Sequence, residues 1–103
     1  RLIEFANSLA GKRVKILFGA LKRKDYSGML QTLQAGLPEA ELILTTFHYG
    51  EVVAQGDRQD LPYVADYKAY IKEFMDQSRP DEVLFVTGSL YFIAEVRAFL
   101  LEG

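Results

Sequence analysis

The sequence predicts an α/β domain of three layers, with a mainly parallel sheet and helices on both of its faces. Two observations lead to this prediction. Short apolar runs rich in β-branched and aromatic residues alternate along the chain with amphipathic helical patterns. Polar segments with Gly, Ser or Asp separate these elements, as turns and helix starts do. Folds of this kind bind ligands beyond the carboxyl ends of the strands.

The composition describes a small domain with a substantial core and excludes several classes of protein. The chain has 103 residues, half of them hydrophobic, and a net charge of −2, which gives no electrostatic footprint for nucleic acid. It has no cysteine and one histidine, so disulfides and Cys- or His-rich metal sites are excluded. No signal peptide is visible, and no apolar run approaches the roughly 20 residues of a membrane span. We therefore expect a soluble, cytoplasmic domain without nucleic-acid or membrane partners.

The first half of the chain predicts two helices around a strand. Apolar residues at helical spacing mark the first helix, which Gly11 ends: Leu2, Phe5, Ala6 and Leu9. A buried strand follows over 14–18, and Asp25 is placed to cap the next helix. Gly36 and Pro38 end that helix. Its predicted inner stripe is Tyr26, Met29, Leu30, Leu33 and Leu37.

The middle of the chain predicts a second strand over 41–47 and then a long polar loop over 48–60. A loop of this length is unusual in a compact domain, which hints at function, and it has room for a short turn or strand. A third helix is expected to begin near Pro62 or Val64 and to end at 78–80. Its predicted inner stripe is Val64, Tyr67, Ile71, Phe74 and Met75.

The last third of the chain predicts a strand that turns directly into a helix. The apolar run 83–86 is typical of a buried strand, Gly88 permits a sharp turn, and Ser89 is a good helix N-cap. The helix stripe is Phe92, Ile93, Val96, Phe99 and Leu100. Such a turn presents backbone N–H groups and the positive end of the helix dipole, which suit a phosphate or a carboxylate.

Three segments are expected to meet at the carboxyl edge of the sheet: 19–25, 45–49 and 87–91. Each feature there also fits a purely structural role. The turn Thr87–Gly88–Ser89 is either an anion site or an ordinary capped turn. The loop 22–25 is either a cationic lid or a solvated loop that ends in a cap. His48 is either a general base or a loop histidine.

Other polar residues carry no visible chemistry. Nothing in the spacing of the loop and helix-start carboxylates pairs them for acid–base work: Glu51, Asp57, Asp60 and Asp66. The aromatic residues along the third helix suit packing better than cofactor stacking: Tyr63, Tyr67, Tyr70 and Phe74. The chain also lacks the glycine-rich nucleotide-binding motifs and the serine hydrolase motif. No catalytic residue and no metal ligand is therefore assigned.

Three blocks in order resemble the C-terminal domain of folylpolyglutamate synthases, including the bifunctional dihydrofolate synthases of the Mur ligase superfamily. The blocks are ILFGALKRKDY at 16–26, LTT at 44–46 and LFVTGSLYFIAEVR at 84–97. The last block is the most specific, and the resemblance covers nearly the whole chain. It implies that residues 1–103 form a Rossmann-like, glutamate-ligase C-terminal domain that is truncated at its N-terminus.

The resemblance implies an ATP-dependent ligase that adds glutamate to folate. ATP phosphorylates the folate carboxylate, and the glutamate amine attacks the acyl phosphate. ATP and Mg²⁺ are then cofactors of the whole enzyme, held mostly by a missing N-terminal ATPase domain, and the fragment alone is expected to be inactive and to bind none. Thr87, Gly88 and Ser89 match the turn that helps to bind glutamate. Lys22, Lys24 and Asp25 match a loop with an interface or anion-binding role.

One departure from the family pattern is large. The family's D-G-A-H-N-type motif and its P-loop are both absent from these residues, and the neighbours of His48 do not fit that motif. Two alternatives stay open: the C-terminal domain of another Mur-type amino-acid ligase, and a stand-alone α/β binding module. A receiver-like module would need acidic residues at the strand ends, where this chain has Phe18–Gly19, Thr46–Phe47 and Thr87–Gly88.

Overall fold

The computed structural model describes residues 2–8, 11–22 and 25–102, and it has a single four-stranded parallel sheet in the order β3-β2-β1-β4. The strands are β1 (Arg13–Gly19), β2 (Glu41–Thr45), β3 (Tyr63–Val64) and β4 (Glu82–Gly88). The helices are α1 (Leu2–Asn7), α2 (Tyr26–Gly36), α3 (Tyr67–Gln77) and α4 (Leu90–Glu102), with a 3₁₀ turn η1 (Gln55–Asp57). The predicted α/β fold with a parallel sheet is confirmed.

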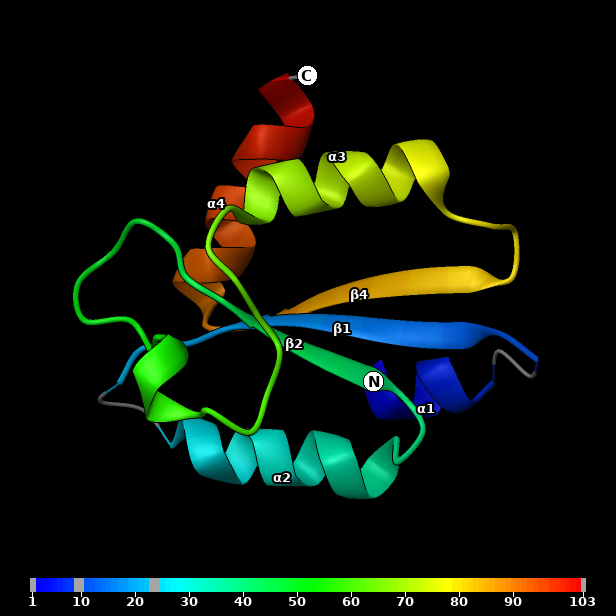
Figure 1. Ribbon diagram of the computed structural model, residues 1–103, viewed down its shortest axis with the longest axis horizontal. Coiled ribbons are helices and arrows are strands. Elements are labelled where there is room, and N and C mark those ends of the chain that lie inside the picture. The colour runs from blue at the N-terminus through cyan, green and yellow to red at the C-terminus, as the bar shows by residue number, and fades with distance from the viewer. Residues whose placement is uncertain (1, 9–10, 23–24, 103) are drawn as a thin grey trace.

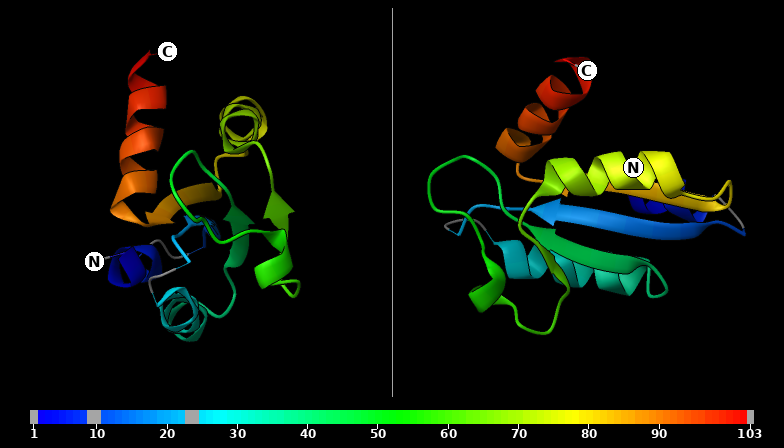
Figure 2. Two further views of the ribbon diagram at one scale, coloured as in Figure 1. Left: turned by 90° about the vertical axis from the view of Figure 1, so that its left-hand side faces the viewer. Right: turned by 45° about the horizontal axis from the view of Figure 1, so that its top comes forward.

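The helices form two layers, one on each face of the sheet (Figures 1 and 2). Helices α1 and α2 cover one face, and α3 and α4 lie on the other. A hydrophobic core lies on each face of the sheet. Side chains of β1 contribute to both cores, because successive side chains of a strand point to opposite faces. Ile16 and Phe18 pack with Leu30 of α2, whereas Leu17 packs with Ile71 of α3 and with α4. The sheet is therefore apolar on both faces, as parallel sheets require.

Aspartate side chains cap the starts of α2 and α3, and the cap predicted at Asp25 is confirmed. The Asp25 carboxylate accepts a hydrogen bond from the Gly28 N–H at 3.0 Å, at the start of α2. The Asp66 carboxylate accepts one from the Ala69 N–H at 3.1 Å, at the start of α3. Each carboxylate satisfies an amide that has no partner within its helix.

The segment before α3 differs from the prediction. Val64 does not start a helix: Tyr63 and Val64 form β3, which pairs with the end of β2. The Thr45 hydroxyl also donates to the Val64 carbonyl oxygen at 2.6 Å. A two-residue strand is too short to show a period of its own, so the sequence pattern assigned it to the following helix. The predicted strand over 41–47 also ends early, at Thr45.

The polar loop 48–60 folds back on the loop that follows β1. Val52 forms an antiparallel bridge with Leu21, and the Val53 N–H donates to the Ala20 carbonyl oxygen at 2.8 Å. Val53 is completely buried. The short extra structure expected in this loop is therefore present, as the Val52 bridge and η1.

The last strand was predicted to be buried, but the structure shows it only half-buried. Every residue of β4 is half-buried, because β4 is an edge of the sheet and has a neighbour on one side only. The carboxyl half of α4 extends away from the sheet (Figure 1), and Leu100 and Leu101 are exposed. Leu100 was predicted to lie on the inner stripe but is exposed, whereas Phe92 and Val96 of that stripe are buried.

The N-terminal helix is shorter than predicted. Helix α1 ends at Asn7, so Gly11 is not its C′ residue, although Gly11 has a positive φ of 80°. Leu9 of the predicted stripe lies outside the described residues. Over the part of the chain that the structure describes, no helix combines the length and apolar character needed to cross a membrane.

Candidate functional site

The turn Thr87–Gly88–Ser89 leaves the carboxyl end of β4 directly beside the end of β1. Thr87 pairs with Phe18 and Gly88 with Gly19, and the Ser89 N–H donates to the Gly19 carbonyl oxygen at 2.8 Å. Gly88 has φ of 124°, which L side chains rarely adopt. The turn is thus held by backbone contacts with the neighbouring strand.

Ser89 is the N-cap of α4, as predicted. Its hydroxyl oxygen accepts from the Tyr91 N–H at 3.1 Å, and its carbonyl oxygen accepts from the Ile93 N–H at 3.0 Å. Ser89 is half-buried, and Leu90 beside it is 81% exposed, so the amino end of the helix is at the surface. The first-turn amides and the helix dipole make this end electropositive.

The structure brings together the three segments that were expected to meet. The turn at Ser89 contacts Gly19 at the end of β1. The segment after β2 also contacts α4, since the rings of Tyr49 and Tyr91 stack with centroids 4.0 Å apart and planes 15° apart. Phe47 packs on Phe92 in the core below, with ring centroids 5.1 Å apart. All three loops therefore line one edge of the sheet, around the start of α4.

The cationic loop is partly engaged in contacts of its own. The Lys22 ammonium lies 3.7 Å from the Asp57 carboxylate, and the Lys22 N–H donates to the Glu51 carbonyl oxygen at 2.9 Å. The Asp25 carboxylate caps α2. Lys24 lies outside the described residues. This loop joins the polar loop over 48–60 at the same edge of the sheet, and Lys22 stays half-exposed there.

A polar cluster that the sequence analysis missed lies between α4, α3 and the segment after β2. The Glu95 carboxylate accepts hydrogen bonds from the Tyr67 hydroxyl at 2.7 Å and from the His48 N–H at 3.2 Å. It also lies 3.2 Å from His48 Nδ1. His48 and Glu95 are far apart in sequence, so no motif spacing could reveal the pair. The available signal was Glu95 itself, an acidic side chain in the middle of the mostly apolar sequence of α4.

The hydrogen bonds set the protonation state of this cluster. Burial raises the pKa of Glu95, but the hydrogen bonds from Tyr67 and His48 outweigh it, so the pKa lies below the ordinary value for a glutamate. Burial and then the Glu95 carboxylate raise the pKa of the Tyr67 hydroxyl. Glu95 is therefore ionised and Tyr67 protonated at neutral pH, which keeps donor and acceptor matched.

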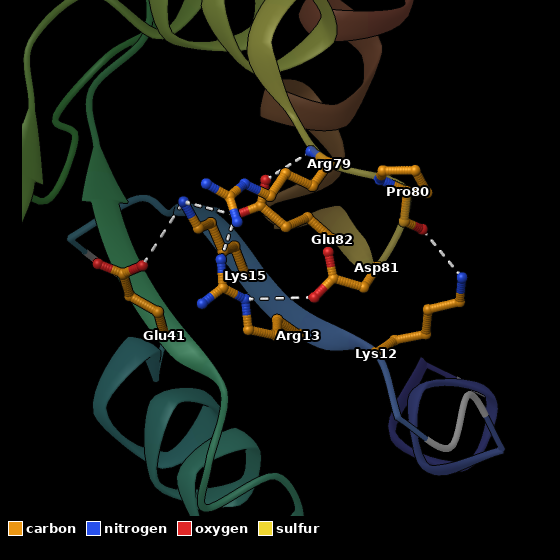
Figure 3. Close-up of polar contacts among 8 residues, drawn as sticks. All are labelled: Lys12, Arg13, Lys15, Glu41, Arg79, Pro80, Asp81 and Glu82. Carbon is orange, nitrogen blue, oxygen red and sulfur yellow. Dashed lines mark hydrogen bonds and ion pairs between the residues drawn. The ribbon is translucent and has the colours of Figure 1, made fainter.

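A cavity of about 690 Å³ lies at the opposite, amino end of the sheet and is lined by both signs of charge. Figure 3 shows Arg13 and Lys15 pointing toward Glu82, at 3.1 and 3.8 Å. Arg13 also lies 3.7 Å from Asp81, and Lys15 lies 4.0 Å from Glu41. Because these cations already face carboxylates, the cluster holds the amino ends of β1, β2 and β4 together and offers no anion site.

The carboxylates of the polar loop do not converge. Asp57 accepts from the Ala54 N–H at 2.8 Å, and Asp60 pairs with Arg58 through two hydrogen bonds of 2.9 and 2.8 Å. Asp66 is the cap of α3. Across residues 2–8, 11–22 and 25–102, no three His, Cys, Asp or Glu side chains group closely enough to hold a metal ion.

Comparison with known proteins supports the expected resemblance. No family profile matches the chain. The chain is 29% identical, over 103 residues, to a dihydrofolate synthase/folylpolyglutamate synthase of Bacillus subtilis (strain 168), a match that covers 90% of this chain and 22% of that protein. Its fold is similar to the crystal structure of a bifunctional folylpolyglutamate synthase/dihydrofolate synthase from Yersinia pestis, which is complexed with AMPPNP and a Mn ion. The TM-score is 0.79 at 20% identity, over 97% of this chain and 25% of that one.

These matches confirm the expected resemblance and the expected fold, over a part of the matched proteins. The resemblance to this group of synthases is confirmed: the chain is similar to a C-terminal portion of such enzymes. The α/β fold is that of the solved relative. The chain spans about a quarter of the length of the proteins it matches.

Proposed function

We propose that this chain is the C-terminal domain of an ATP-dependent ligase that adds glutamate to folate. The observation that carries the proposal is the exposed, Ser89-capped start of α4 at the edge where three strand-end loops meet. The similarity to dihydrofolate synthase/folylpolyglutamate synthase supports the substrate class. We place the parent enzyme in the cytoplasm, where its remaining part would include an N-terminal ATPase domain.

In the proposed reaction, the chain binds and orients the incoming glutamate. A helix N-terminus capped by a hydroxyl suits a carboxylate, because backbone N–H groups and the dipole favour negative charge there. Thr87, Gly88 and Ser89 form this subsite. The glutamate amine would then attack the acyl phosphate of the folate carboxylate, forming the amide and releasing phosphate. Lys22, Lys24 and Asp25 are proposed to have an interface or anion-binding role.

ATP and Mg²⁺ are proposed as cofactors of the whole enzyme, and the solved relative contains AMPPNP and a Mn ion. The described residues do not themselves fit a metal site, because they offer no group of three suitable donor side chains. The chain therefore contributes substrate orientation to the reaction, and the chain alone should not release ADP from MgATP in the presence of folate and glutamate. Appreciable release by the isolated chain would contradict this division of roles.

The glutamate subsite is tested with Ser89→Ala in the full-length enzyme. We expect the KM for glutamate to rise at least about fivefold, the equivalent of roughly 1 kcal/mol for one lost hydrogen bond, while the KM for ATP stays within twofold. Ser27→Ala, an exposed serine on α2, is the matched control. An unchanged glutamate dependence would remove Ser89 from the site. Replacing glutamate by other amino acids in the same assay would reveal a different Mur-type ligase.

A further inference from the structure

We propose that Glu95 is a positioning residue for the glutamate subsite. It holds the segment 46–50 against the start of α4, so that this segment forms a second wall beside the Ser89 turn. The inference rests on the proposed function, because it assigns a role to a side chain that supports the same subsite. It adds that glutamate binding requires Glu95 to hold the segment 46–50 in place, which follows neither from the capped turn nor from the similarity to known synthases.

The hydrogen bonds of Glu95 join three elements at the carboxyl edge of the sheet. Glu95 belongs to α4, His48 follows β2, and Tyr67 is the first residue of α3. The carboxylate accepts from the Tyr67 hydroxyl at 2.7 Å and from the His48 N–H at 3.2 Å. The backbone bond to His48 is the more informative contact, since it fixes the path of the chain and not just a side chain.

Burial makes these contacts effective. The Glu95 side chain is 22% exposed, and Tyr67 is 3% exposed. A charge-assisted hydrogen bond in such surroundings is stronger than an exposed one, and removing one partner leaves a buried polar group unsatisfied. The His48 ring, in contrast, is 87% exposed. The position of the segment 46–50 therefore depends on the hydrogen bonds that the His48 N–H and the Tyr67 hydroxyl donate to Glu95.

A second contact links this segment to the Ser89 turn. Tyr49 stacks on Tyr91, and the Tyr91 N–H donates to the Ser89 hydroxyl oxygen. Figures 1 and 2 show the segment after β2 beside the first turns of α4. Two adjacent residues, His48 and Tyr49, thus contact α4 at positions 95 and 91, one helical turn apart. Loss of the Glu95 contact would loosen the segment immediately next to the capped serine.

Glu95 acts through these groups and not by contact with the substrate. Its carboxylate is negatively charged, as are both carboxylates of glutamate, and protein donors already occupy its oxygen atoms. A direct contact with the substrate ammonium would depend on the charge of Glu95. A positioning role depends mainly on the hydrogen bond accepted from the His48 N–H, which the one glutamine oxygen can retain while its amide nitrogen faces the Tyr67 hydroxyl oxygen. The two roles therefore differ in their response to Glu95→Gln.

The test compares Glu95→Ala, Glu95→Gln and Tyr67→Phe in the full-length enzyme, with Glu102→Gln as a control for charge at an exposed position of α4. We expect Glu95→Ala to raise the KM for glutamate about tenfold, with the KM for ATP within twofold. Glu95→Gln and Tyr67→Phe should each raise it about threefold, which corresponds to the coupling energies typical of residues in one network. The double variant Glu95→Ala/Tyr67→Phe should have the same KM for glutamate as Glu95→Ala alone, because Glu95→Ala already removes the hydrogen bond that Tyr67→Phe removes.

A structural readout accompanies the kinetics. Hydrogen exchange of the His48 amide should accelerate at least about tenfold in Glu95→Ala and stay unchanged in Glu102→Gln. An unchanged His48 exchange rate would overturn the inference. So would an unchanged glutamate KM in Glu95→Ala, or a loss in Glu95→Gln as large as in Glu95→Ala. A wild-type enzyme without glutamate-dependent turnover would instead overturn the proposed function, and the role of Glu95 at that subsite with it.

Discussion

Gly19 and Gly88 pair at the carboxyl ends of β1 and β4, and neither has room for a side chain without displacement of its neighbours. A Cβ atom on Gly88 would lie 2.0 Å from the Gly19 carbonyl oxygen, and one on Gly19 would lie 2.8 Å from the ring of Phe92. The close approach lets the Ser89 N–H reach Gly19. The geometry of the candidate site thus depends on two residues that have no side chain.

Gly88→Ala should destabilise the domain by about 3 kcal/mol or more, because it combines a disfavoured φ with a backbone clash. Urea unfolding followed by circular dichroism measures this loss. Gly50→Ala is the matched control, since a Cβ at that exposed position meets nothing within 4 Å. Equal stability of the two variants would mean that the turn is not held as described.

Phe92→Ala should cost about 3–5 kcal/mol, because the ring is completely buried between Phe47 and Tyr67. Leu90→Ala on the same helix removes an 81% exposed side chain and should change stability by less than about 0.5 kcal/mol. The difference between their urea midpoints measures how firmly α4 is packed on the sheet. A mild effect of Phe92→Ala would show that α4 is docked differently.

Asp25→Ala should lower stability by about 1 kcal/mol through loss of the cap of α2, whereas Asp25→Asn should stay close to the wild type, because asparagine caps equally well. Thermal or urea unfolding distinguishes the two variants. Asp76→Ala, at an exposed position within α3, serves as the control for charge. Equal losses in Asp25→Ala and Asp25→Asn would show that the charge matters more than the cap.

Acid should weaken the amino edge of the sheet through Glu82. A hydrogen bond from the Arg79 N–H, with Lys15 and Arg13 nearby, lowers the pKa of this carboxyl from 4.5 despite the opposing effect of burial. The unfolded chain then takes up the proton first, so this stability is present above about pH 5 and is lost as the pH falls through the folded-state pKa. Unfolding midpoints at several pH values should depend less on pH in Glu82→Gln than in Glu39→Gln, which removes an exposed carboxylate. Parallel curves would contradict the assignment.

Some elements were predictable because their signals are local. Asp25 and Ser89 were recognised as caps from their position before amphipathic patterns, and each accepts the expected backbone hydrogen bond. The strand β3 was missed because two residues carry no period, and its assignment depends on pairing with β2. The half-exposure of β4 was missed because an apolar run does not reveal whether a strand has one neighbour or two.

The sequence alone determined the class of fold, the capped turn at Ser89 and the resemblance to folate–glutamate ligases, because these depend on residues close together in the chain. Only the tertiary structure decided that Gly19 pairs with Gly88 and that the Glu95 carboxylate accepts hydrogen bonds from Tyr67 and His48. Those contacts join residues from different elements, and packing of the helices on the sheet brings them within hydrogen-bonding distance. The packing of segments around the candidate site therefore depends on the tertiary structure, whereas the Ser89-capped start of α4 can be recognised in the sequence.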